Sequence, residues 1–170
     1  ARDGRLLANL ASAMQCRNIV ELGTNLGVGA LYLAHSAHCQ KLITIEGCPT
    51  LSQMAATAFK QLGANNITTI NERFESALPK VLSEMSTIDL LFIDGNHSYQ
   101  PTMSYFAQCL PFAGNDTFFV IDDIHKNAEM ERAWHEIIEN ERVTLTLDFY
   151  TMGVVFFRSQ LSRQTICLRY

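Results

Sequence analysis

The sequence has no excess of basic residues. Its 13 Lys and Arg residues are outnumbered by 17 Asp and Glu residues, so the formal net charge is −4 at pH 7. Binding to a nucleic-acid backbone draws on a basic surface, which this composition does not provide. We therefore expect no nucleic-acid partner and, in its place, a small-molecule ligand.

The sequence also lacks long apolar runs and paired cysteines. No run approaches the roughly 20 apolar residues of a membrane helix, and no basic-then-apolar leader opens the chain. The five cysteines form neither a Cys-x-x-Cys pair nor a zinc-type spacing with His. Unpaired thiols are typical of a reducing compartment. We expect a cytoplasmic protein with no membrane partner.

Length and hydrophobic content set the number of domains. At 170 residues, 48% of them hydrophobic, the chain can bury one sizeable core but is short for two ordinary domains. We expect one domain over residues 1–170. It has a leading helix over 1–17, a core of sheet and helices over 18–158, and a tail over 159–170.

Short β-branched runs alternate with helical patterns from residue 18 onward, as in βαβ units with a parallel sheet. The predicted strands cover residues 18–22, 41–46, 66–71, 88–94, 117–122, 143–149 and 154–158. The last two have no room between them for a crossover helix and predict an antiparallel hairpin. This order resembles class I methyltransferases, which implies an α/β, Rossmann-like, seven-stranded mostly parallel sheet with helices on both faces and a C-terminal antiparallel β-hairpin.

Three segments repeat apolar residues at helical spacing, which predicts amphipathic helices packed on the sheet. The predicted core positions are Leu51, Met54, Ala55, Ala58, Phe59 and Leu62; Met103, Phe106, Ala107 and Leu110; and Met130, Ala133, Trp134 and Ile137.

The loop after the first predicted strand reads ELGTNLGVG over residues 21–29. It is neither Gly-x-Gly-x-x-Gly nor a P-loop, but its glycines would let the backbone approach a ligand closely. A carboxylate at Glu21 could accept hydrogen bonds from a ligand's ammonium group. The candidate cofactor-binding residues of this loop are Glu21, Gly23, Thr24, Asn25, Gly27 and Gly29.

The second predicted strand ends in Glu46-Gly47. An acidic side chain at this place can accept hydrogen bonds from the two ribose hydroxyls of an adenosine. NAD also carries ribose, so Glu46 alone leaves an NAD-linked Rossmann oxidoreductase open.

The loop sequence ELGTNLGVG resembles the first motif of class I methyltransferases, and TIEG resembles their second. The resemblance implies S-adenosylmethionine (SAM) as cofactor. It also implies that the residues after the third strand frame the adenine, and we choose Phe74 and Glu75 among them. For Phe74, an ordinary place in the core is the alternative.

Acidic residues follow the fourth and fifth predicted strands. Asp94 ends one strand, and Asp122 and Asp123 end the next. We expect these carboxylates to converge on one rim of the sheet, where their repulsion is unfavourable unless protons or a cation intervene. Oxygen ligands suit a hard ion such as Mg²⁺.

The acidic constellation is similar to that of metal-dependent O-methyltransferases that act on catechols, caffeoyl-CoA and certain sugars. The resemblance implies that Asp94, Asp122 and Asp123 bind a divalent metal and that His97 acts as general base. Asp94 is also a candidate contact for the cofactor. The lysine of the catechol enzymes is absent at His97 and its neighbours, which weakens a catechol assignment.

Other interpretations of the same residues stay open. Asp94 could have a structural or cofactor-side role in a metal-free methyltransferase, Asp122 and Asp123 could cap the next helix, and His97 could cap a turn. His125 is a second candidate for the substrate pocket.

The function expected from the sequence is SAM-dependent, divalent-metal-assisted O-methylation of a small hydroxylated molecule. The alternatives are a metal-independent methyltransferase, an NAD-linked oxidoreductase, and a domain that binds cofactor without catalysis. A homodimer stays open as a partner arrangement.

Overall fold

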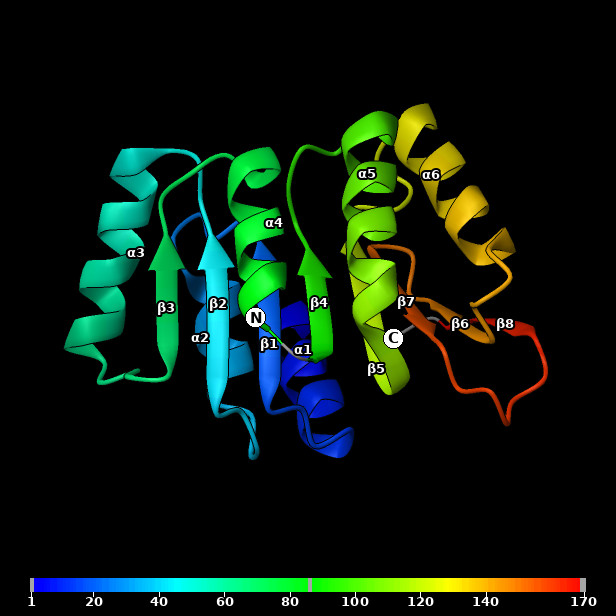
Figure 1. Cartoon of the computed structure of the whole chain (residues 1–170), viewed down its shortest axis with the longest axis horizontal. Coiled ribbons are helices and arrows are strands. Elements are labelled where there is room, and N and C mark those ends of the chain that lie inside the picture. Colours follow the sequence, from blue (N-terminus) through cyan, green and yellow to red (C-terminus); the bar gives the residue numbers. More distant parts are fainter. Residues whose placement is uncertain (1, 86, 169–170) are drawn as a thin grey trace. The chain divides into compact units, whose positions relative to one another are not determined.

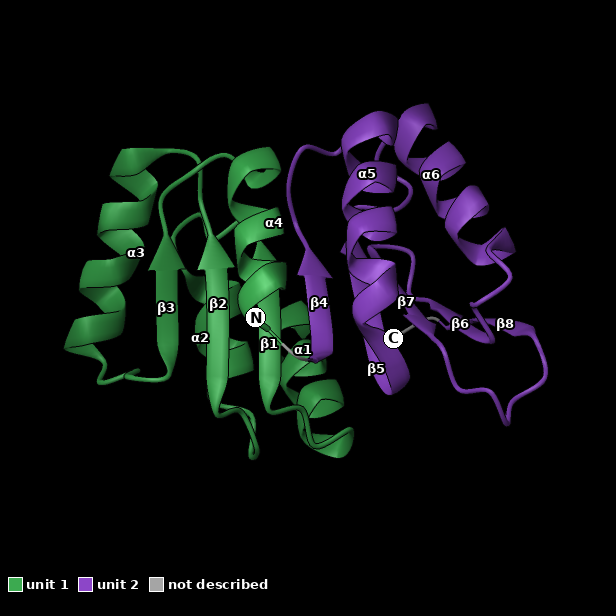
Figure 2. Cartoon of the chain, viewed as in Figure 1, with its two compact units in different colours: residues 1–86 green, residues 87–170 purple. Residues whose placement is uncertain are grey.

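The computed structural model describes residues 2–85 and 87–168. The chain divides into two compact units, residues 1–86 and 87–170 (Figure 2). None of the helices in the described residues is long and apolar enough to cross a membrane.

Unit 1 alternates helices with three parallel strands. Its elements are α1 (Arg2–Ala13), β1 (Asn18–Leu22), α2 (Val28–Ala34), β2 (Lys41–Ile45), α3 (Pro49–Gln61), β3 (Ile67–Ile70) and α4 (Phe74–Glu84). The strands lie in the order β3-β2-β1. Helices α3 and α4 cover one face and α1 and α2 the other (Figure 1). Buried β-branched and leucine side chains of β1 and β2 fill the space between these layers.

Unit 2 contains the predicted hairpin. Its elements are β4 (Ile88–Ile93), α5 (Tyr99–Cys109), a 3₁₀ turn (Leu110–Phe112), β5 (Ala113–Asp122), α6 (Ala128–Glu139), β6 (Leu145–Asp148), β7 (Met152–Phe156) and β8 (Gln164–Cys167). The strand order is β4-β5-β7-β6-β8. Strands β4 and β5 are parallel, whereas β7 runs antiparallel to both β5 and β6.

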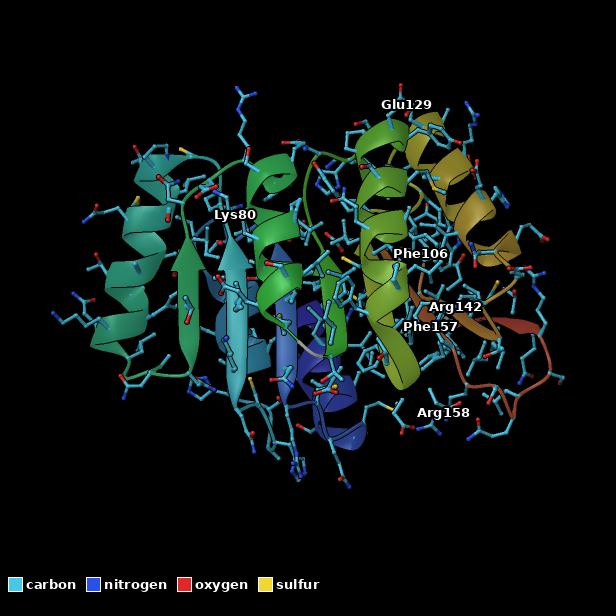
Figure 3. The ribbon with its side chains drawn as sticks, viewed as in Figure 1. Lys80, Phe106, Glu129, Arg142, Phe157 and Arg158 are labelled. Carbon is cyan, nitrogen blue, oxygen red and sulfur yellow. The ribbon has the colours of Figure 1, made fainter. Side chains whose placement is uncertain are left out.

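The packing of unit 2 is centred on β4 and β5. Strand β4 is almost continuously buried, and β5 is buried over residues 117–121, as expected for strand segments covered on both faces. Phe106 of α5 meets Phe119 of β5 edge-on, with ring centroids 5.9 Å apart. At the start of β5, the Arg142 guanidinium donates to the carbonyl of Ala113 and lies near the ring of Phe157 (Figure 3).

The structure confirms the α/β class, the mostly parallel strands and the antiparallel hairpin, and it adds one strand. Strand β8 pairs parallel with β6 and lies within the segment predicted as a tail over 159–170, of which residues 169–170 are outside the described part. Its residues are all exposed. An exposed strand needs no alternation of apolar and polar residues, so its sequence did not predict a strand.

The apolar faces of two helices differ from those predicted. On α3, Met54 is 52% exposed, and Leu62, just past its end, is 62% exposed. On α5, Tyr105 and Cys109 are buried with Phe106, whereas Ala107 is exposed. All four positions predicted on α6 are buried.

Candidate functional site

The glycine-rich loop of unit 1 connects β1 to α2. Gly23 and Gly27 have φ values of 109° and 80°, and Asn25 has a φ of 48°. A Cβ atom at Gly27 would also lie 2.5 Å from Cε1 of the buried Phe59. Both the backbone conformation and the packing therefore require glycine at position 27. Gly29 lies in the first turn of α2.

Glu21 is buried below this loop. Its side chain lies in β1 with 1% exposure, and its carboxylate accepts a hydrogen bond from the Thr44 hydroxyl at 2.5 Å. Because a threonine hydroxyl has one hydrogen, Thr24 must be the donor in the 2.6 Å contact between the Thr24 and Thr44 hydroxyls. Glu21 thus fixes the loop through two threonines, and its direct contact with a cofactor stays a prediction.

Glu46 follows β2 and holds its carboxylate in place with backbone donors. The N–H groups of Asn25 and Cys48 donate to its two oxygens at 2.9 and 2.8 Å. The Asn71 side-chain amide donates to its backbone carbonyl at 2.7 Å. A carboxylate has about four acceptor positions. Two of them are therefore left for other donors, such as a pair of ribose hydroxyls.

The other candidate cofactor residues of unit 1 are Gly47, Phe74 and Glu75. A Cβ atom at Gly47 would meet no atom nearer than the Glu72 carbonyl oxygen at 3.9 Å. Phe74 begins α4 and is half-buried, so the alternative interpretation, a place in the core, is not favoured. Glu75 beside it is exposed. The contacts of Glu46, Phe74 and Glu75 with the adenosine part of SAM stay predictions.

Three acidic side chains follow β4 and end β5 in unit 2, as predicted. The side chains of Asp94 and Asp122 are hydrogen-bonded to each other. Burial raises the pKa of Asp94. Burial, followed by the charges of Asp94 and Asp123, raises the pKa of Asp122 to about 7. A bond between two carboxyl groups requires a proton on one of them. This bond raises the pKa of Asp122 and lowers that of Asp94, which assigns the proton to Asp122.

His97 lies beside these acids. Its Nε2 atom is 3.8 Å from Oδ1 of Asp94 and 3.5 Å from Oδ2 of Asp123. The loop that carries it is anchored at two points. The Asn96 amide donates to the Tyr105 hydroxyl at 2.7 Å, and the Asn127 amide donates to the His97 carbonyl at 3.1 Å. The structure thus brings His97 together with the predicted acidic residues.

Comparison with known proteins identifies the family. The sequence matches the family described as "Methyltransferase domain" over residues 20–124. The chain belongs to this family. The match includes both the loop after β1 and the acids that end β5, and it confirms the resemblance to methyltransferases. It gives no support to the NAD-linked alternative.

Two relatives are catechol O-methyltransferases. Those of Mycobacterium tuberculosis and Niastella koreensis are 26% and 27% identical over 130 and 131 residues. The alignments cover 73% and 75% of this chain but 56% and 58% of the relatives. The chain therefore spans little more than half the length of these curated relatives.

A solved structure supports the fold. The O-methyltransferase TomG from Streptomyces achromogenes, in complex with SAM, superposes with a TM-score of 0.79 at 23% identity. The superposition covers 94% of this chain and 81% of that one.

Sequence reasoning missed a lysine that contacts the acidic cluster of this methyltransferase domain. Lys126 follows β5, and its Nζ atom lies 2.6 Å from Oδ2 of Asp123. The backbone N–H of Lys126 donates to the Asp123 carbonyl at 3.0 Å, which closes a turn. A lysine three residues after an acid in a predicted loop is the signal that could have found it. The loop between β4 and α5 contains no lysine, whereas the loop between β5 and α6 contains Lys126.

The cluster is not arranged as a ready metal cage. Among residues 2–85 and 87–168, no group of three or more His, Cys, Asp or Glu side chains is placed to hold a metal ion. The oxygen donors of Asp94, Asp122 and Asp123 have the chemistry that Mg²⁺ takes. Before a cation could bind, Asp122 would have to lose the proton that it shares with Asp94. The Lys126 ammonium group would also have to move away from Asp123.

Proposed function

We propose that the protein transfers a methyl group from SAM to a hydroxyl oxygen of a small molecule, with a divalent cation held by Asp94, Asp122 and Asp123. One observation carries the proposal. Half-buried acids at the ends of β4 and β5 share a proton beside His97, in a chain of the methyltransferase-domain family. A cluster of this kind gains stability when a cation replaces the proton.

Unit 1 would hold SAM. The carboxylate of Glu46, fixed by two backbone N–H groups, would accept hydrogen bonds from the ribose hydroxyls. The half-buried ring of Phe74 would pack on the adenine. Gly23 and Gly27 would keep the loop close to the ligand through their left-handed backbone conformations.

Unit 2 would hold and activate the acceptor. A bound divalent cation supplies positive charge that favours the deprotonated form of an acceptor hydroxyl. His97 accepts the hydroxyl proton on its imidazole. The acceptor oxygen forms a bond to the methyl carbon while the carbon–sulfur bond of SAM breaks, and the bonding electron pair stays on sulfur. The charges balance because the sulfonium becomes a neutral thioether as His97 gains the proton.

The contact between Lys126 and Asp123 favours a second candidate, methyl transfer without a metal. The ammonium group already places a positive charge 2.6 Å from one of the carboxylates. Burial raises the pKa of Asp94, and the charge of Lys126 offsets part of that rise. In this version, Lys126 takes the electrostatic role of the cation and His97 keeps its role as base. The two candidates differ in their dependence on Mg²⁺.

Calorimetric titration separates the candidates. We expect the wild-type protein to bind S-adenosylhomocysteine (SAH) and, with SAH present, Mg²⁺. The substitutions Asp94→Asn and Asp122→Asn should abolish Mg²⁺ binding, and Asp122→Asn should keep SAH binding. Asp116→Asn is the matched control, because Asp116 lies at the other end of β5 and pairs with Arg158. Unchanged Mg²⁺ binding in both cluster variants would overturn the metal assignment, and methyl transfer that persists in excess chelator would establish the second candidate.

A further inference from the structure

An exposed aromatic residue, Tyr150, lies in the turn between β6 and β7 of unit 2. Its side chain is 73% exposed, and its φ is 70°. A bulky residue rarely adopts this left-handed conformation, and strain of this kind is concentrated at functional sites. The turn holds it there, because the Tyr150 N–H donates to Oδ1 of Asp148 at 2.8 Å.

Asp148, at the end of β6, connects this turn to two other elements. Its Oδ2 atom accepts from Nε2 of His125 at 3.0 Å and from the indole N–H of Trp134 at 3.2 Å. The Trp134 ring lies so close to Gly153 of β7 that a Cβ atom there would be 2.3 Å away. Asp148 therefore fixes the His125 ring, the turn and helix α6 against one another.

The rings of His125 and Tyr150 are stacked. Their centroids are 5.4 Å apart, with 30° between the planes. The second nitrogen of His125 faces the Glu131 carboxylate at 3.6 Å. Since one face of the tyrosine lies on His125, its 73% exposure leaves the other face open. The pair presents a flat aromatic surface, and Asp148 fixes its orientation through the His125 ring and the Tyr150 backbone.

This surface adjoins the acidic end of β5. Asp122 pairs with Met152 in the β5–β7 ladder. The Asp123 N–H donates to the carbonyl of Thr151, the residue after Tyr150, at 2.7 Å. His125 lies two positions beyond Asp123. The backbone thus joins the aromatic pair directly to the acids proposed to hold the cation.

We propose that Tyr150, supported by His125, is a subsite that binds the flat ring of an aromatic methyl acceptor by stacking. The inference rests on the proposed function and deepens it, because it names the class of acceptor and a residue that selects it. Stacking on the tyrosine face orients the ring so that its hydroxyl groups face the acidic end of β5, where the proposed cation would bind. An aliphatic diol gains nothing from this surface.

The chain carries its own reporter for the test. Trp134 is the single tryptophan of the sequence, and its indole donates to the same carboxylate that holds Tyr150. Its fluorescence can follow titrations with catechol, phenol and 1,2-propanediol in the presence of SAH. Phenol has one hydroxyl and cannot chelate a cation, so its binding measures the contribution of the ring alone.

Two substitutions at Tyr150 separate the ring from the backbone. Tyr150→Phe keeps the aromatic face, and Tyr150→Asn removes it with a residue that tolerates positive φ. We expect Tyr150→Asn to weaken the binding of catechol and phenol by about tenfold, with 1,2-propanediol unchanged. Tyr150→Phe should bind all three as the wild type does. Leu62→Ala is the control for loss of an exposed apolar side chain, since Leu62 is 62% exposed in unit 1.

The outcomes keep this proposal apart from the proposed function. A loss of phenol binding in Tyr150→Asn supports the aromatic subsite even if no Mg²⁺ binding is found. Equal affinities of the wild type and Tyr150→Asn for phenol and catechol overturn the subsite, whether or not the protein binds a metal and transfers methyl groups.

Discussion

The acidic residues at the strand ends of the two units are satisfied in different ways. In unit 1, each oxygen of Glu46 accepts a hydrogen bond from a backbone N–H. In unit 2, Asp122 is hydrogen-bonded to another carboxyl group, and burial with neighbouring negative charges raises its pKa to about 7. Donors of the fold itself therefore fix the first carboxylate, whereas the second group depends on a proton or a cation.

The difference separates a binding site from a chemical centre. A carboxylate held by rigid backbone donors changes little when a ligand arrives, which limits the cost of ordering the site. Acids that share a proton respond to whatever charge comes near them. Perturbed pKa values of this kind are concentrated at functional sites. The predictions below test this contrast, first in unit 1 and then in unit 2.

The largest effect is expected for Gly27→Ala in unit 1. The φ of 80° disfavours any L side chain, and the new Cβ atom would clash with buried Phe59. We expect a loss of roughly 2 to 5 kcal/mol in the free energy of unfolding, measured by chemical denaturation. Gly63→Ala is the matched control, because Gly63 has a φ of 69° but no atom within 4 Å of its added Cβ. Its loss should be only about 1 to 2 kcal/mol. Equal losses would show that packing on Phe59 contributes nothing.

Glu46→Gln should reduce ligand affinity while leaving the fold stable. The amide presents an N–H group to one of the two backbone donors and loses the negative charge that ribose hydroxyls would meet. We expect the affinity for SAH to fall by roughly 10- to 100-fold, measured by calorimetry, with an unchanged melting temperature. Glu84→Gln, at the end of α4, is the control. Full affinity in Glu46→Gln would remove Glu46 from the cofactor site.

The sequence predicted those parts of the fold and site that depend on local pattern. β1 was predicted with its observed bounds because its residues form one buried β-branched and leucine run. Asp94 and Asp122 were placed together because the carboxyl ends of parallel strands meet at one edge. On α6 the apolar stripe was correct because it is bordered by charged residues such as Glu131 and Arg132.

The remaining features depend on tertiary partners. The contact of Glu21 with the Thr44 hydroxyl on the neighbouring strand was not expected from the sequence, and its contact with a cofactor stays a prediction. The face of α5 was misjudged because Ala107 is small enough to be exposed at little cost, while Tyr105 is held by the Asn96 amide. Asp148 binds His125 and Trp134 through contacts that no spacing in the sequence predicts.

The acids of unit 2 should make the stability of the metal-free protein depend on pH. The pKa of Asp122 rises from an ordinary 3.8 to about 7 on folding, so the folded chain binds more protons than the unfolded chain between these values. The free energy of unfolding therefore falls as pH rises through this window. We expect the melting temperature, measured with a chelator present, to decrease from about pH 5 to about pH 8 more steeply in the wild type than in Asp122→Asn. Identical slopes would contradict the raised pKa.

Removing the Lys126 ammonium group from its contact with Asp123 should strengthen metal binding by a small factor. Lys126→Met frees Oδ2 of Asp123 and removes a competing cation, so we expect Mg²⁺ to bind about two- to fivefold more tightly, in line with the strength of an exposed ion pair. Lys80→Met is the matched control, because Lys80 of unit 1 (Figure 3) makes a similar contact with Glu72 at 2.7 Å. It should leave Mg²⁺ affinity unchanged. Weaker Mg²⁺ binding in Lys126→Met would mean that the lysine supports the metal site. Loss of methyl transfer with no change in Mg²⁺ affinity would place Lys126 in the chemistry itself and favour the metal-free candidate.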